Sequence, residues 1–281
     1  MIRRIAVLGA GTMGHGIAHA AIAAGYDTRM FDVSLEALEN GRTAIETIVG
    51  KGVDLGKVPA GEADAMVRRL QTTASLPAAL DECDFVIEAA PERLDVKIAL
   101  LGEVDRLISP RTVIATNTSA LSITELAGST TAPARVAGMH FFNPVHKMKL
   151  VEIVQALDSA PETLDAIDRV AKQMGKETVL VRESPGFITT RVNASIGNEA
   201  FYMLMEGVAS ARDIDKALKL GLNHPMGPFE LVDLVGLDTR LSILEYLHRS
   251  MGEKYRPCPL LAQYVKAGRL GRKTGRGVYD Y

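Results

Sequence analysis

A glycine-rich turn between a short apolar run and a helical pattern is the feature that most restricts how this chain can fold. The apolar run is Ile5 to Leu8, and the turn is Gly9-Ala10-Gly11-Thr12-Met13-Gly14. Apolar residues then recur at helical spacing as far as Gly25. A second short strand is predicted over residues 28–31, and Asp32 ends it. A strand, a G-x-G-x-x-G turn, a helix and an acidic residue after the next strand together indicate a dinucleotide-binding unit.

Each residue of this motif has a physical reason to be there. Gly9 permits the tight turn, Gly11 lets the backbone approach a pyrophosphate, and Gly14 lets the helix pack closely on the strand. The phosphates are expected at the helix N-terminus, where backbone N–H groups and the helix dipole favour an anion. Asp32 can accept hydrogen bonds from two ribose hydroxyls and would repel a 2′-phosphate. The motif therefore predicts NAD as cofactor rather than NADP.

Strand and helix patterns continue to alternate after this unit. Ser34 is a predicted N-cap. A helical hairpin is expected around the turn-rich segment 51–61, with its second helix over residues 62–70. Further strands are predicted over 85–87, 112–115, 136–139, 150–154 and 178–181. Regular alternation of this kind predicts an α/β fold, with a Rossmann-like, doubly wound, mostly parallel sheet between two layers of helices.

The pattern changes at Ser184-Pro185-Gly186. Beyond this point the sequence shows helical spacing and turns but almost no strand signal. Helices are predicted over residues 187–205, 211–220, 229–235 and 238–251. We therefore expect an NAD-binding domain over residues 1–184 and an all-helical domain over 185–281.

Composition and charge argue against several classes of protein. The 281 residues carry a formal net charge of −2, and the basic turn from Arg269 to Arg276 is isolated, so we expect no nucleic-acid partner. No apolar stretch approaches the ~20 residues of a membrane span, and the N-terminus lacks the features of a signal peptide. Cys83 and Cys258 are typical of free thiols in a reducing compartment. The expectation is a cytoplasmic protein without a membrane partner.

Metal binding is not expected either. His15 and His19 have the i, i+4 spacing of a helical ligand pair, but the sequence offers no third ligand beside them.

Polar clusters follow two more predicted strands, at the sheet edge where such folds bind ligands. One cluster ends in Ser119 and the other runs from His140 to Asn143. Glu152 lies within an apolar strand, where a carboxylate is costly to bury without a partner. His140 is the nearest suitable partner, and the pair would give a general base with a fixed tautomer. A capping histidine and a solvated glutamate fit the spacing equally well.

Glu92 and Lys97 follow the predicted strand 85–87 and belong to the same edge. Contact with the cofactor is one interpretation of their position. Helix capping and surface exposure fit it at least as well.

A set of longer motifs covers the whole chain in order: GAGTMG, NTSAL, MHFFNPV, KLVEIV, SPGFI, HPMGPFELVDLVGLD and GRKTGRGVYDY. The set resembles the 3-hydroxyacyl-CoA dehydrogenase family, in particular its bacterial 3-hydroxybutyryl-CoA type. The resemblance implies reversible, NAD-dependent oxidation of a short-chain (S)-3-hydroxyacyl-CoA to the 3-ketoacyl-CoA.

The resemblance also implies roles for individual residues. His140 matches the family's general base, Glu152 its paired carboxylate, and Ser119 the hydroxyl that contacts the substrate's 3-oxygen near the nicotinamide. Four residues match positions near the cofactor: Glu92, Asn143, Lys97 and Lys273. Asn143 is also a candidate for contact with the substrate. Lys51 and Lys57, in the predicted hairpin, are candidates for contact with CoA phosphates.

One position departs from the family pattern. Thr190 stands where the family has a catalytic asparagine before an arginine, here Arg191. Threonine offers one hydroxyl donor in place of an amide with two. Thr190 itself, a water molecule or Asn193 is expected to take over the role.

The helical domain has more apolar surface than a small lobe needs, and in the family it forms the dimer, so we expect a homodimer. Two other functions stay open. The chain could oxidise a hydroxy acid that carries no CoA, as gulonate dehydrogenases do, or serve as a non-catalytic structural relative. Acyl chain length and pathway stay open as well, across fatty-acid breakdown, butyrate or polyester metabolism and the catabolism of dicarboxylyl-CoA compounds.

Overall fold

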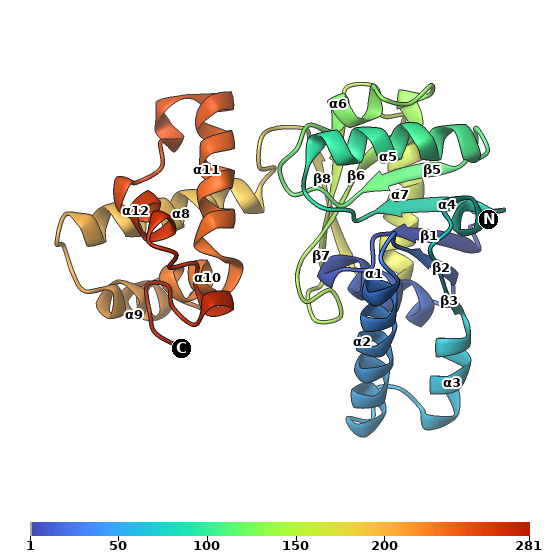
Figure 1. The fold of residues 1–281 in the computed structure, drawn as a ribbon, viewed down its shortest axis with the longest axis horizontal. Helices are drawn as coiled ribbons and strands as arrows, with labels where there is room; N and C mark the ends of the chain where they lie inside the picture. Colours follow the sequence, from blue (N-terminus) through green and yellow to red (C-terminus); the bar gives the residue numbers. More distant parts are fainter. Residues whose placement is uncertain (1) are drawn as a thin grey trace. The chain divides into compact units, whose positions relative to one another are not determined.

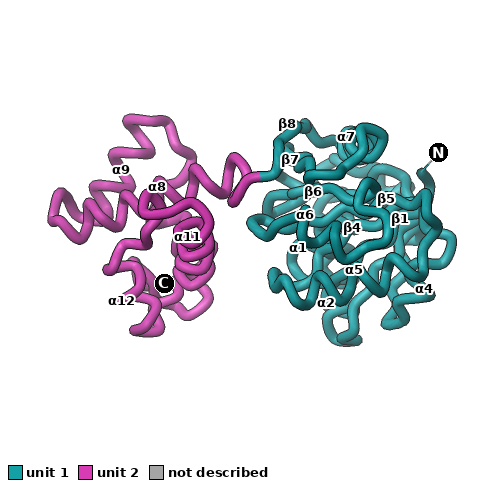
Figure 2. Tube along the Cα trace, turned by 90° about the horizontal axis from the view of Figure 1, so that it is seen from above, with its two compact units in different colours: residues 1–183 teal, residues 184–281 magenta. Residues whose placement is uncertain are grey.

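The structure, a computed structural model, describes residues 2–281 (Figure 1). The chain forms two compact units, Met1–Glu183 and Ser184–Tyr281, which Figure 2 shows in different colours. Each unit has a hydrophobic core of its own. Within residues 2–281, no helix combines the length and the apolar character that a bilayer crossing requires.

Unit 1 is built on an eight-stranded sheet with the order β3-β2-β1-β4-β5-β6-β7-β8. Neighbouring strands are parallel except β6 and β7, so the sheet is mostly parallel, as predicted. The strands are β1 (Arg4–Leu8), β2 (Asp27–Phe31), β3 (Leu70–Thr73), β4 (Phe85–Glu88), β5 (Val113–Thr116), β6 (Val136–Phe141), β7 (Leu150–Gln155) and β8 (Glu177–Arg182).

Helices cover both faces of this sheet, and Figure 1 shows α5 and α6 on the face opposite α1. Ile17 of α1 and Ile167 of α7 belong to one core cluster with Met30 of β2. Unit 1 contains α1 (Thr12–Ala23), α2 (Leu35–Asp54), α3 (Ala60–Arg68), α4 (Leu76–Leu80), α5 (Leu94–Leu107), α6 (Ile123–Ala127) and α7 (Pro161–Gln173). The doubly wound α/β prediction is confirmed.

The predicted helical hairpin is present as α2 and α3. The hydroxyl of Ser34 accepts a hydrogen bond from the backbone N–H of Ala37 at 3.1 Å, so Ser34 caps α2 as predicted. The structure differs at Leu70, which the sequence pattern assigned to the second helix. Leu70 begins β3, which pairs with β2 at the edge of the sheet. Leu70 is the one fully buried residue of this short strand, so the sequence carries little strand signal there.

Unit 2 is helical, as predicted. Its core includes Phe201 and Phe229, whose rings meet edge to face at 5.1 Å, together with Leu244, Leu247 and Leu261. The helices are α8 (Thr189–Met205), α9 (Ala211–Gly221), α10 (Pro228–Val235), α11 (Leu237–Met251) and α12 (Pro259–Lys266). The sequence patterns did not indicate α12.

Two buried carboxylates of unit 2 hold the C-terminal segment. Asp233 accepts hydrogen bonds from the backbone N–H groups of Val278 and Tyr279 and from the Tyr281 hydroxyl. Asp215 accepts from the Tyr279 hydroxyl at 2.7 Å and from a backbone N–H at the start of α10. The last residues of the chain are thereby fastened to α9 and α10.

Candidate active site

The glycine loop between β1 and α1 has space only for glycine at two of its positions. Gly9 has a φ of 112°, and a Cβ there would lie 2.5 Å from the carbonyl oxygen of Ala89. A Cβ on Gly14 would lie 1.8 Å from the carbonyl oxygen of Gly9. The first glycine therefore makes the turn, and the last allows α1 to approach β1 closely.

The start of α1 fits a phosphate group. Gly11 is the N-cap, and no side chain within residues 2–281 caps the helix. A Cβ on Gly11 would meet nothing within 4 Å, so the space in front of the first helical turn is open. The first turn holds no acidic residue that would repel an anion. The loop thus offers backbone N–H groups to a pyrophosphate.

Asp32 lies beside this loop, at the end of β2. One carboxylate oxygen accepts a hydrogen bond from the N–H of Ala10 at 2.8 Å, and the other accepts from the N–H of Ser34 at 3.0 Å. Each carboxylate oxygen can accept more than one hydrogen bond. The half-buried carboxylate is therefore fixed and can still receive ribose hydroxyls. The glycine loop and Asp32 together fit NAD.

His140 and Glu152 lie directly opposite each other on the antiparallel strands β6 and β7. The Nδ1 atom of His140 is 2.7 Å from Oε2 of Glu152, and the two residues are 4% and 0% exposed. A neutral imidazole that donates its Nδ1 proton to the carboxylate presents an unprotonated Nε2 atom. This arrangement is suited to accepting a proton from an alcohol. The structure thus brings together the pair that the sequence suggested.

Glu92 organises the loop that carries Ser119. Its Oε1 atom accepts hydrogen bonds from the Ser119 N–H at 2.7 Å and from the Thr118 hydroxyl at 2.7 Å. The contact to Ser119 uses the backbone and not the hydroxyl. Lys97, which was expected near the cofactor, is 1% exposed, and its ammonium donates to Glu88 and to the Ala90 carbonyl.

Two residues of this edge were given no role by the sequence reasoning, although Asn117 belongs to the polar cluster that ends in Ser119. Glu88 ends β4 and is 0% exposed. Asn117 accepts a hydrogen bond from the N–H of Phe141, next to His140, at 2.8 Å. A carboxylate at the end of an apolar strand is the same signal that singled out Glu152, so Glu88 could have been found. The amide of Asn117 has no comparable signal.

The remaining predicted residues follow β6, lie near the end of α2 or belong to unit 2. Asn143 is exposed and follows β6, with a cis peptide bond to Pro144. Lys51 and Lys57 are exposed near the end of α2. In unit 2, Thr190 is half-buried in the first turn of α8. Lys273, also in unit 2, has its ammonium 2.6 Å from the Asp238 carboxylate.

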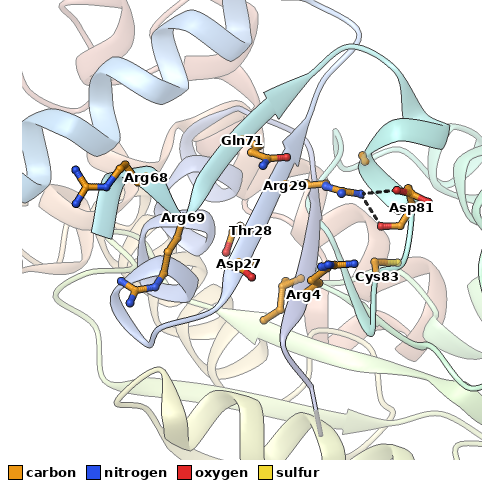
Figure 3. Close-up of a pocket in the computed structure, with 11 residues that line it drawn as sticks. Arg4, Asp27, Thr28, Arg29, Arg68, Arg69, Gln71, Asp81 and Cys83 are labelled. Carbon is orange, nitrogen blue, oxygen red and sulfur yellow. Dashed lines mark hydrogen bonds and ion pairs between the residues drawn. The ribbon is translucent and has the colours of Figure 1, made fainter. Parts of the chain in front are cut away.

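A cavity of about 220 Å³ lies at the opposite edge of the sheet, near the beginnings of β1, β2 and β3 (Figure 3). Four arginines contribute to its lining: Arg4, Arg29, Arg68 and Arg69. Arg29 donates to the backbone oxygens of Ala78 and Asp81, and Arg4 forms an ion pair with Glu82. Ligands of parallel α/β sheets bind beyond the carboxyl ends of the strands. The active site is therefore assigned to the edge that carries His140.

Comparison with known proteins agrees with this assignment. Residues 4–184 match the model of the 3-hydroxyacyl-CoA dehydrogenase NAD binding domain, and residues 186–281 match that of the C-terminal domain of the same family. The chain is 47% identical to a Bacillus subtilis protein named probable 3-hydroxybutyryl-CoA dehydrogenase, over 100% of this chain and 98% of that protein. It is 40% identical to the Escherichia coli 3-hydroxyadipyl-CoA dehydrogenase, over 100% of this chain and 59% of that protein.

A solved structure is similar throughout. The crystal structure of (S)-3-hydroxybutyryl-CoA dehydrogenase from Ralstonia eutropha matches with a TM-score of 0.96 and 41% identity, over 100% of this chain and 99% of that one. Two family models span residues 4–184 and 186–281, and the Bacillus subtilis and Ralstonia eutropha relatives match over 98% and 99% of their own length. The chain belongs to the 3-hydroxyacyl-CoA dehydrogenase family of NAD-dependent enzymes.

Proposed function

We propose that this chain oxidises short-chain (S)-3-hydroxyacyl-CoA thioesters reversibly, with 3-hydroxybutyryl-CoA as the preferred substrate and His140 as the general base. The observation that carries the proposal is the 2.7 Å contact between His140 Nδ1 and Glu152 Oε2. The contact is buried at the sheet edge that also holds the glycine loop and Ser119.

The chemistry follows from that geometry. Nε2 of His140 takes the proton of the substrate's 3-hydroxyl, because Nδ1 is engaged by Glu152. The carboxylate stabilises the imidazolium that forms, and the Ser119 hydroxyl holds the 3-oxygen. NAD, when bound, supplies the acceptor for the hydride from C3. In the reverse direction the imidazolium returns its proton to the oxygen. A positioned acid–base group contributes about 10²–10⁴ in rate.

Other residues complete the proposed site. Gly9 to Gly14 hold the pyrophosphate and Asp32 a ribose. Four residues shape the cofactor site: Glu92, Asn143, Lys97 and Lys273. Asn143 also faces the substrate. Lys51 and Lys57 contact CoA phosphates. Thr190, the half-buried residue at the position of the family's asparagine, takes part in substrate orientation.

The experiment that tests this function measures NADH formation by the purified protein. We expect turnover with 3-hydroxybutyryl-CoA and none with free 3-hydroxybutyrate or L-gulonate. A series of thioesters of rising chain length, with 3-hydroxyadipyl-CoA included, defines the acyl preference. The last compound belongs in the series because a relative 40% identical to this chain is named for it. Absence of turnover with every thioester would contradict the proposal.

His140→Ala is the sharpest variant for the mechanism. We expect kcat to fall by about 10²–10⁴, the usual contribution of general acid–base catalysis, while the Kd for NADH stays within about threefold. His248→Ala is the matched control, because His248 also contacts a glutamate, Glu253, at 3.2 Å but on the exposed surface of unit 2. The control is expected to keep wild-type turnover. Near-normal turnover in His140→Ala would remove His140 from its role.

We also propose that the protein is a homodimer formed through unit 2. Several large apolar side chains of this unit are more than two-fifths exposed: Ile188, Val192, Met205, Val208, Leu220, Leu222, Leu234 and Val235. Apolar surface of this kind is a common component of subunit interfaces. Light scattering on the purified protein is expected to give about twice the chain mass of 30.2 kDa. A monomer across micromolar concentrations would contradict the proposal.

A further inference from the structure

Glu88 is buried at the point where β4 ends, and three groups converge on its carboxylate. Oε1 accepts hydrogen bonds from the Ala90 N–H and from the Lys97 ammonium, both at 2.6 Å. Oε2 accepts from the Thr116 hydroxyl at 2.6 Å. Thr116 ends the neighbouring strand β5 and lies opposite Glu88 in the sheet register. One carboxylate therefore joins the ends of two strands and the first turns of α5.

Lys97 connects this carboxylate to a second one. Its ammonium is 2.6 Å from Glu88 and 3.5 Å from Oε2 of Glu92. Glu92 in turn accepts the backbone N–H groups of Ser119 and Ala120 through Oε1. The contacts form a continuous path from Glu88 through Lys97 and Glu92 to the backbone of Ser119.

The same path also fixes the backbone beside the glycine loop. Ala90 is held at both ends, because its N–H donates to Glu88 and its carbonyl accepts from Lys97 at 3.0 Å. A Cβ on Gly9 would strike Ala89 and come within 3.2 Å of the Ala90 nitrogen, so this backbone packs directly against the glycine loop. The path thus links the loop assigned to NAD with the loop assigned to the substrate's 3-oxygen.

We propose that Glu88 and Lys97 are positioning residues that set the place of Ser119 relative to the dinucleotide loop. In this role Lys97 acts through its contacts with Glu88 and Glu92. Buried and paired charges hold their partners in one geometry, because moving either charge away leaves the other desolvated and unpaired. A loop displaced by about 1 Å can cost on the order of 100-fold in rate. The inference rests on the proposed function of Ser119.

A merely structural role is the competing explanation, and the chain offers a matched control for it. Asp105 lies near the other end of the same helix, α5, and pairs with Arg135; both are buried. This ion pair also fastens α5 to the rest of unit 1, but at a distance along the helix from the Ser119 loop. Asp105→Asn should therefore lower stability without moving the catalytic groups.

The test compares Glu88→Gln, Lys97→Met, the double variant and Asp105→Asn. Hydrogen exchange of the Ser119 and Ala120 amides is expected to accelerate about tenfold in the first three variants and to stay unchanged in Asp105→Asn. In the same three variants, kcat with 3-hydroxybutyryl-CoA is expected to fall about 10- to 100-fold. The Kd for NADH should stay within about threefold in Glu88→Gln and Asp105→Asn, and Asp105→Asn should keep kcat within about twofold. The double variant should lose no more activity than the worse single one, because both act along one path.

Lys97→Met alone provides the test if Glu88→Gln does not fold, since it interrupts the path and keeps the Thr116 hydroxyl, which donates to Glu88 and accepts the Thr118 N–H. Unchanged hydrogen exchange and kcat in the folded variants would overturn the inference. An equal fall of kcat in Asp105→Asn would also overturn it, and so would a fall of kcat in the double variant equal to the product of the two single effects. Hydrogen exchange needs no substrate. If the wild type failed to oxidise the thioester, the proposed function would fail while the positioning of the loop would still be tested.

Discussion

The fold opposes protonation of the His19 imidazole on α1. Its Nδ1 atom is buried without a hydrogen-bond partner within the described residues 2–281. Burial lowers the pKa of His19 to about 4, and positive charge on His146, Lys176 and His15 adds to the effect.

This depressed pKa predicts acid sensitivity of folding. The unfolded chain, with a histidine pKa near 6.5, takes up the proton before the folded chain does. The contribution of His19 to the free energy of unfolding is therefore fully present above pH 6.5 and is lost as the pH drops from 6.5 towards 4. The loss is on the order of 2 kcal/mol after allowance for partial solvent exposure.

Urea unfolding at several pH values measures this effect. His19→Gln removes the titrating group, so its free energy of unfolding should depend less steeply on pH between 6.5 and 4 than that of the wild type. His224→Gln, which changes a half-buried histidine of unit 2, should keep the wild-type slope. Identical slopes in His19→Gln and the wild type would show that His19 is not responsible.

The site residues differ in how visible they are in the sequence. Glu152 could be singled out because a charge among apolar strand residues requires a partner, and His140 was available. Asp32 and the glycines follow from their spacing. The contacts of Lys97 could not be predicted, because an ammonium on a helix gives no sign of whether it points to solvent or to a buried carboxylate.

At the scale of elements, two glycines of one loop serve different purposes. Alanine substitutions separate their effects on stability from their effects on NADH binding. Gly14→Ala places a Cβ 1.8 Å from the Gly9 carbonyl oxygen, so α1 must move away from β1. We expect a loss of about 2 kcal/mol or more in stability, in the range of overpacking, together with loss of NADH binding. Gly11→Ala meets nothing within 4 Å, so the fold should keep its melting temperature within a few degrees.

The NADH affinity of Gly11→Ala should still fall, about tenfold or more, because the added methyl group occupies the space in front of the helix. Thermal unfolding and NADH fluorescence titration measure the two effects. Equal affinity in Gly11→Ala and the wild type would place the pyrophosphate elsewhere.

Elements with a strong periodic signal were predicted, and those without one were not. The strands β4 to β8 and the helices α8 to α11 correspond to the expected segments. Even β8, which buries only Val181, shows the apolar run Val179, Leu180 and Val181 in the sequence. The edge strand β3 was missed because Leu70 is its one apolar residue. The helix α12 was missed because it is a short helix, with Leu261 as its one fully buried residue.

For the molecule as a whole, the C-terminal segment is part of the structure of unit 2. Asp233→Asn weakens three hydrogen bonds that converge on one buried carboxylate. We expect a loss of about 2 kcal/mol in the stability of unit 2, in the range for hydrogen bonds to a charged group. Denaturant unfolding followed by circular dichroism measures it. Asp280→Asn, an exposed neighbour paired with Arg276, should change stability by less than about 0.5 kcal/mol.

The division of the chain was visible in the sequence because periodicity changes type near residue 184, where strands cease. The hydrogen bonds that hold the C-terminal segment could not be predicted from the sequence. Asp215 and Asp233 lie in helical patterns, where a carboxylate usually faces water, and most of their partners, apart from the hydroxyls of Tyr279 and Tyr281, are backbone N–H groups that any sequence supplies. Partners of this kind leave no trace in composition or spacing.

The antiparallel pairing of β6 with β7 makes the proton-transfer pair a property of strand register. His140 and Glu152 face each other because the ladder sets their register. The segment 142–149 joins the two strands and carries the buried Val145 of the core. A register shift of one residue would turn Glu152 to the other face of the sheet. A redesign of this enzyme must therefore keep the β6–β7 pairing if it is to keep the acid–base pair.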